Sequence, residues 1–157
     1  MSEIDVDVDA GTVRLERTYA ASVEVVFDAW TNPEVLKRWW KADPTHEVTI
    51  AALDVRVGGG YRFEMHRPDG EEHVVHGTYR EVARPHRLVY SWAWEGTGPY
   101  ADHESEVAVT FAEAEPGRTT VVIEHAGLLD DVSRANHASG WNGVLDSFAR
   151  SGIAAAH

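Results

Sequence analysis

Residues 61–82 carry the sequence YRFEMHRPDGEEHVVHGTYREV, and this stretch decides the fold. Apolar and polar side chains alternate over Tyr61–His66 and again over Val74–Val82, which is the period of a half-buried β-strand. Pro68-Asp69-Gly70 lies between the two runs and favours a turn, because proline presets φ and glycine accepts a positive φ. The stretch therefore predicts a β-hairpin with one apolar and one polar face.

The flanking sequence predicts further strands and three helices. Strands are expected at residues 13–19, 46–50, 88–94, 105–111 and 119–125, and helices at about 22–31, 33–40 and 130–150. Consecutive hairpins imply an antiparallel sheet whose apolar face must be covered. Only the last helix is long enough to cover it, and Gly140 and Gly143 within this helix predict close packing against another element.

Pairing the strands through their turns assigns each side chain to a face. We expect Phe63 and Trp92 opposite Gly77, Val109 opposite Val121, and Glu64 beside His76. The apolar face then collects Tyr61, Phe63, Met65, Val75, Tyr79, Tyr90, Trp92, Trp94, Val107, Val109, Phe111, Val121 and Ile123. The polar face collects Arg62, Glu64, His66, His76, Arg80, Ser91, Glu106, Thr120 and Glu124. The same assignment across three hairpins predicts a half-buried sheet.

The aromatic residues of the apolar face allow two interpretations. Large rings with polar tips, next to a glycine in a strand interior, are typical of the wall of a small-molecule cavity. Aromatic residues at strand period are equally typical of a filled core. The residues by themselves leave both interpretations open.

Four polar residues fall on the expected apolar face: Arg17, His103, Ser105 and His125, with Ser105 across from His125. They could orient the polar end of a ligand, or pair with neighbours at the strand ends, because an unpaired buried polar group costs about 1–3 kcal/mol. No carboxylate or oxyanion hole that would complete a catalytic triad is visible around the serine and histidine. His73 and His76 point to opposite faces of their strand, so we expect no metal site.

Composition narrows the class of protein. The chain has 157 residues, 14 Lys+Arg against 26 Asp+Glu, a net charge of −12 and no cysteine. These values predict one domain spanning residues 1–157, no nucleic-acid partner, and no disulfide or thiolate chemistry. No signal peptide or membrane-spanning segment is visible, so we expect a cytoplasmic protein with residues 1–10 flexible and no membrane insertion.

Several segments, taken in order, resemble a known family. They are 16–19 (ERTY), 25–34 (VVFDAWTNPE), Trp39-Trp40, 57–63 (VGGGYRF), 68–70 (PDG) followed by Gly77, 84–92 (RPHRLVYSW), 119–125 and Gly140-Trp141. The chain resembles the START-like (SRPBCC, helix-grip) superfamily. Within it, the chain is similar to the bacterial single-domain relatives of the C-terminal domain of the Hsp90 ATPase activator.

The resemblance implies an α+β helix-grip fold. A curved antiparallel sheet of six or seven strands would wrap around the long C-terminal helix, with two short helices after the first strand and a hydrophobic cavity between sheet and helix. The resemblance also implies a link to the stress response. The metal or iron sites of its hydroxylase branch need ligands that this chain does not bring together, so we expect neither a cofactor nor a metal.

We therefore expect a carrier or sensor of a small hydrophobic, aromatic ligand. The candidate wall is Trp40, Phe63, Met65, Tyr79, Tyr90, Trp92, Val107, Val109, Trp141 and Leu145, with Arg17, Ser105 and His125 as polar anchors. One alternative is a cyclase, dehydratase or hydrolase with His125 or a tyrosine as acid and base. Another is a chaperone-interacting module, against which the polar outer face argues. A homodimer through an edge strand is also plausible.

Overall fold

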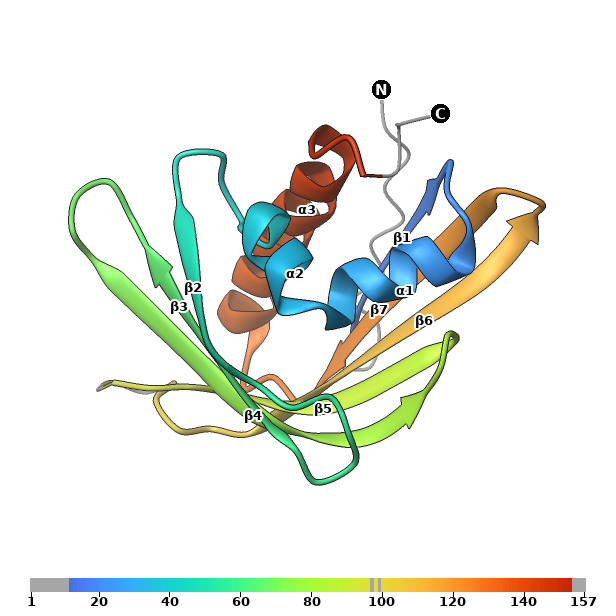
Figure 1. The fold of residues 1–157 in the computed structure, drawn as a ribbon. Helices are drawn as coiled ribbons and strands as arrows, with labels where there is room; N and C mark the ends of the chain where they lie inside the picture. The colour runs from blue at the N-terminus through green and yellow to red at the C-terminus, as the bar shows by residue number, and fades with distance from the viewer. Residues whose placement is uncertain (1–11, 97, 99, 154–157) are drawn as a thin grey trace.

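The computed structural model describes residues 12–96, 98 and 100–153 (Figure 1). The elements are β1 (Val13–Tyr19), α1 (Val23–Thr31), α2 (Pro33–Trp39), β2 (Glu47–Leu53), β3 (Gly60–His66), β4 (Glu72–Ala83), β5 (Arg87–Trp94), β6 (Ser105–Glu115), β7 (Arg118–Ala126) and α3 (Asp131–Arg150). Residues 1–10, expected to be flexible, lie outside the described residues. The order of strands and helices is the one predicted from the sequence.

The described strands form one antiparallel sheet in the order β1-β7-β6-β5-β4-β3-β2. The sheet curves, and α1, α2 and α3 lie on its concave side (Figure 1). This is the α+β helix-grip arrangement that the sequence predicted. The two edges are β1 and β2, and the edge-strand dimer stays a prediction. Within the described residues, no helix is long and apolar enough to cross a bilayer.

Side-chain caps define where each helix begins. The Ser22 hydroxyl accepts a hydrogen bond from the Val25 amide, and the Asn32 side chain does the same for Glu34 at the start of α2. At α3, the Asp130 carboxylate accepts the Ser133 amide at 2.8 Å. Each cap satisfies an N–H group that the first turn leaves without a partner, which fixes the helix start in the sequence.

The two sheet faces are as predicted, but two of the predicted strand registers are wrong by two residues. Phe63 pairs with Val75, because β3 and β4 approach the Pro68–Gly70 turn more closely than expected. Val109 pairs with Ile123, because β6 and β7 continue pairing to Glu115 and Arg118. A slip of two residues leaves every side chain on its expected face.

The neighbours expected for Gly77 and Glu64 change with the register. Gly77 pairs with Tyr61, and Arg62, not Glu64, pairs with His76. The space above Gly77 is therefore not open to a ligand. A Cβ built on Gly77 would lie 1.9 Å from the Ser91 carbonyl oxygen and 2.6 Å from the Tyr61 ring.

The C-terminal end of α3, from Leu145 onward, is packed solidly against the sheet and the other helices. The Phe148 ring meets Tyr19 and Trp39 edge to face, with centroid distances of 4.7 and 4.8 Å. The Tyr19 hydroxyl donates to the Leu145 carbonyl at 2.9 Å, and the Ser147 hydroxyl donates to the Trp39 carbonyl at 2.5 Å. Apolar burial and satisfied polar groups together anchor this end of the helix.

Candidate functional site

The part of α3 from Ser133 to Val144 borders a cavity of about 390 Å³ that opens to solvent. Its lining comes from α3, from β3, β4 and β5, from the segment after α2 and from the loop before β6. The lining residues are Trp40, Ala42, Met65, His73, Trp92, Trp94, Tyr100, Ser133, Asn136, His137, Gly140, Trp141 and Val144. A volume of this size is in the range of pockets for small organic molecules, about 300–1,000 Å³.

Two glycines of α3 determine how closely the helix approaches its neighbours. A Cβ on Gly143 would lie 1.9 Å from the carbonyl oxygen of Ala42, so this glycine lets α3 pack against the segment after α2. This contact confirms the close packing expected at Gly143. A Cβ on Gly140 would meet no atom within 4 Å, so the close packing expected at Gly140 is wrong. Gly140 therefore faces open space, and the cavity owes part of its volume to the missing side chain.

His137 joins the helix to the sheet inside the cavity wall. Its Nε2 accepts hydrogen bonds from the indole N–H groups of Trp94 at 2.9 Å and Trp92 at 3.3 Å. Its Nδ1 lies 2.8 Å from the Ser133 carbonyl oxygen and donates to it. These partners assign a neutral imidazole with its proton on Nδ1, since a protonated Nε2 could not accept from two donors.

A second histidine lies behind the cavity wall. Trp141 donates its indole N–H to Nδ1 of His125 at 3.0 Å, and Nε2 of His125 lies 2.8 Å from the Ser105 hydroxyl. The Ser105 hydroxyl in turn donates to the Trp92 carbonyl at 3.2 Å. The His125 and His137 rings are 4.9 Å apart, so the two hydrogen-bond chains lie side by side.

Burial keeps both imidazoles neutral. It lowers the pKa of His125 well below its usual range, and the neighbouring His137 adds to this shift. Burial also lowers the pKa of His137, although the hydrogen bond to the Ser133 backbone opposes it. The wall therefore carries two uncharged nitrogen acceptors, both occupied by indole N–H groups.

The contact between Ser105 and His125 is not arranged for nucleophilic catalysis. A general base must accept the serine proton at Nε2 while a carboxylate receives the proton of Nδ1. Here the Trp141 N–H occupies Nδ1, so the imidazole proton is on Nε2 and points to the Ser105 oxygen. The serine hydroxyl is directed to a backbone carbonyl. The group can orient Trp141 but cannot activate Ser105 in this tautomer.

The structure brings four of the candidate wall residues to the cavity: Trp40, Met65, Trp92 and Trp141. The other six, Phe63, Tyr79, Tyr90, Val107, Val109 and Leu145, are buried in the core and do not line it. Phe63, Tyr79 and Tyr90 border a separate hollow of about 10 Å³, which has no room for an organic molecule.

The candidate anchors are placed differently from one another. Ser105 and His125 contact each other behind the wall, although the residue directly across from His125 is Val107 and not Ser105. Arg17 is buried away from the cavity lining and binds α3 through Asp146 and Asn142, each at 2.9 Å. His103, also expected to face inward, contacts the Gly127 carbonyl oxygen at 2.7 Å.

Nine lining residues were not among the candidates: Ala42, His73, Trp94, Tyr100, Ser133, Asn136, His137, Gly140 and Val144. His137 lies four residues before Trp141, and this helical spacing was sufficient to place both on one face. Trp94 follows Trp92 by two residues and so shares its face of β5. Tyr100 belongs to the loop before β6, and no periodic signal predicts its position.

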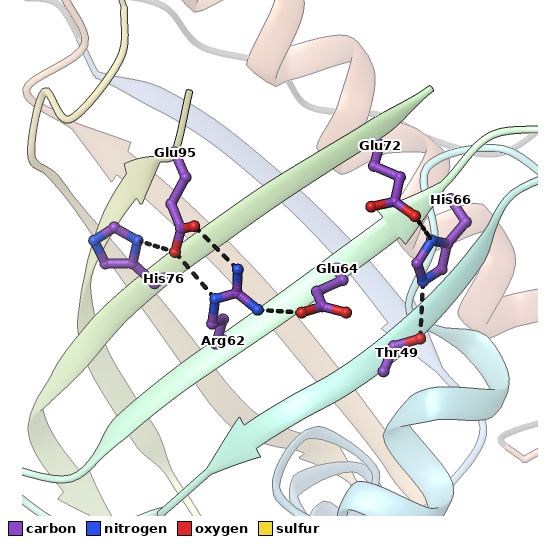
Figure 2. Close-up of polar contacts among 7 residues, drawn as sticks. All are labelled: Thr49, Arg62, Glu64, His66, Glu72, His76 and Glu95. Carbon is purple, nitrogen blue, oxygen red and sulfur yellow. Dashed lines mark hydrogen bonds and ion pairs between the residues drawn. The ribbon is translucent and has the colours of Figure 1, made fainter. Parts of the chain in front are cut away.

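The outer face of β3 and β4 carries a charged cluster that is separate from the cavity (Figure 2). Arg62 contacts Glu64 and both carboxylate oxygens of Glu95, and His76 contacts Glu95 at 3.0 Å. The hydrogen bond from Arg62 lowers the pKa of Glu95. Such exposed pairs each contribute little to stability. Among the described residues, no group of three or more histidines and carboxylates is placed to hold a metal ion.

A curved antiparallel sheet that holds a long C-terminal helix, with two short helices after the first strand, defines the START-like class of proteins. The family described as "Activator of Hsp90 ATPase homolog 1-like protein" matches residues 20–151. The chain belongs to this family. The START-like fold is compatible with ligand binding.

Solved structures agree with this assignment. The AHSA1-like protein from Aeromonas hydrophila is 31% identical, over 92% of this chain and 94% of that chain, with a TM-score of 0.74. The AHSA1 protein from Silicibacter pomeroyi is 26% identical, over 93% and 99%, with a TM-score of 0.81. A protein from Arthrobacter aurescens shares the fold at 21% identity, over 99% and 92%, with a TM-score of 0.81. No curated protein matches the sequence significantly.

Proposed function

We propose that the chain binds a small hydrophobic, aromatic ligand in the cavity between α3 and the sheet, as a carrier or sensor. The observation that carries this proposal is a contrast along α3. Its C-terminal end, from Leu145 onward, is packed solidly, whereas the part from Ser133 to Val144 borders about 390 Å³ of space lined mainly by apolar and aromatic groups. Such a lining, with a few fixed polar groups, is typical of ligand pockets.

The hydrogen bonds of the wall support a preformed site. Trp92, Trp94 and Trp141 are each held by an imidazole, so their rings are ordered before a ligand arrives. A wall that is already rigid loses little conformational entropy on binding, which favours affinity. Because these indoles line the cavity, their fluorescence is expected to report directly whether a ligand occupies it.

Filling the cavity from Gly140 is the sharpest test of this proposal. Gly140→Leu projects a side chain into open space on the helix, and leucine also favours helix more than glycine does. We expect wild type to bind the neutral fluorophore N-phenylnaphthylamine saturably, and Gly140→Leu to bind it at least about tenfold more weakly, a loss of about 1.4 kcal/mol. Titration of the probe emission, with tryptophan emission followed in parallel, measures both affinities.

Gly140→Ala is the matched control, since one methyl group leaves most of the cavity open. It should fold at least as stably as wild type and bind the probe with similar affinity. Equal affinities of wild type and Gly140→Leu would place the probe outside the cavity and refute the proposal. Failure of wild type to bind any neutral aromatic probe would refute it as well.

A further inference from the structure

The cavity wall is a continuous surface of aromatic rings. Trp92 lies at its centre, with ring centroids 5.0 Å from Trp141, 5.5 Å from Trp94 and 6.1 Å from Trp40. Tyr100 adds a fifth ring to the lining. The face of an aromatic ring is its electronegative part and attracts cations, most strongly for tryptophan. A cavity with several indoles is therefore suited to a positively charged organic group.

The polar hydrogens of four of these five rings are already occupied. The N–H groups of Trp92 and Trp94 donate to His137, and that of Trp141 donates to His125. The Tyr100 hydroxyl donates to the Asp130 carboxylate at 3.0 Å. A carboxylate or phosphate ligand would need such hydrogen-bond donors, and most of these ring donors already donate to acceptors of the protein itself.

The charges around the cavity also favour a positively charged ligand. The described lining residues include no lysine or arginine, and the chain has a net charge of −12. The side chains of two lining residues contact carboxylates: Tyr100 contacts Asp130, and His73 contacts Glu71 at 2.7 Å. Asp130 also caps the N-terminus of α3, so its carboxylate offsets the positive end of that helix next to the cavity.

We propose that the ligand carries a bulky organic ammonium group, such as a quaternary ammonium, held against the indole faces, with its apolar body in the rest of the cavity. This inference rests on the proposed function and adds the charge of the ligand to it. The described aromatic lining contains no arginine, and the protein carries a net negative charge. Both features favour such a cation over a neutral or anionic molecule of the same shape.

Three ligands of nearly equal shape separate charge from size. They are benzyltrimethylammonium, its neutral carbon analogue neopentylbenzene, and the anion benzylsulfonate, each used to displace bound N-phenylnaphthylamine. We expect the cation to bind about tenfold more tightly than the neutral analogue, as a desolvated cation–π contact allows, and the anion to bind most weakly. Measurement in about 1 M salt, where the Debye length is about 3 Å, removes general attraction to the acidic surface.

Tyr100 provides matched variants outside the packed core. Tyr100→Leu should reduce the ratio of cation affinity to neutral-analogue affinity about threefold, whereas Tyr100→Phe keeps the ring and this ratio. If the neutral analogue binds as tightly as the cation, the inference is overturned while the proposed function stands. If none of the ligands binds and the fluorophore is not bound either, both are overturned.

Discussion

Gly77→Ala is expected to lower the free energy of unfolding by about 3 kcal/mol, the upper end of the usual cost of overpacking. The added Cβ would lie 1.9 Å from the Ser91 carbonyl oxygen, a backbone atom that cannot rotate away. Strand β5 would have to move from β4, and it carries Trp92 and Trp94 of the cavity wall. Urea unfolding followed by circular dichroism measures the loss.

Gly60→Ala is the control for this substitution in the same hairpin. A Cβ at Gly60 would lie 3.6 Å from the Gly77 carbonyl oxygen, an ordinary contact, and the residue is exposed. We expect a change within about 0.5 kcal/mol, as for most surface substitutions. Equal stability of the two alanine variants would show that β4 and β5 are not as close as described.

Acidification is expected to destabilise the protein through its two buried histidines. Burial lowers the pKa of both His125 and His137 in the folded state, so the unfolded chain binds protons that the folded chain does not. Their contribution is fully present above the ordinary imidazole pKa of about 6.5 and is lost as the pH falls towards the folded values. The free energy of unfolding should therefore fall by up to about 1.4 kcal/mol per pH unit for each histidine.

The slope is measured by urea unfolding at a series of pH values. His125→Gln keeps an acceptor for the Trp141 N–H but does not titrate, so it should flatten the dependence below about pH 6.5. An unchanged slope in His125→Gln, or an NMR titration in which the His125 ring protonates with an ordinary pKa, would contradict the account.

The sheet faces could be predicted because alternation has a period of two residues. A register error of an even number leaves this parity intact, so Phe63 and Val109 are buried as expected although their partners differ. The partners themselves depend on where each turn closes. In the β3–β4 hairpin, the pairing of His66 with Glu72 next to the turn sets the register. The alternation of apolar and polar residues does not encode this pairing.

The location of the cavity could be predicted only in part. The spacing of apolar residues identifies which side chains face the space between α3 and the sheet. How closely α3 approaches the sheet determines which of these side chains line a cavity and which are packed. Leu145 and Trp141 belong to the same helical stripe, yet Leu145 lies in the packed C-terminal end of α3 and Trp141 lines the cavity. His137 was not predicted because it is not an apolar residue, although its spacing from Trp141 is that of the apolar stripe of α3. Its role depends on two indole donors from a strand more than 40 residues earlier.

Intermolecular nuclear Overhauser effects test most directly whether the cavity admits an aromatic guest. In isotope-labelled protein saturated with N-phenylnaphthylamine, we expect cross-peaks from the fluorophore to the rings of Trp92, Trp94 and Trp141. Trp39, fully buried against Phe148, should show none. Cross-peaks confined to surface side chains, or bound fluorophore without contacts to the three cavity indoles, would contradict a ligand site between α3 and the sheet.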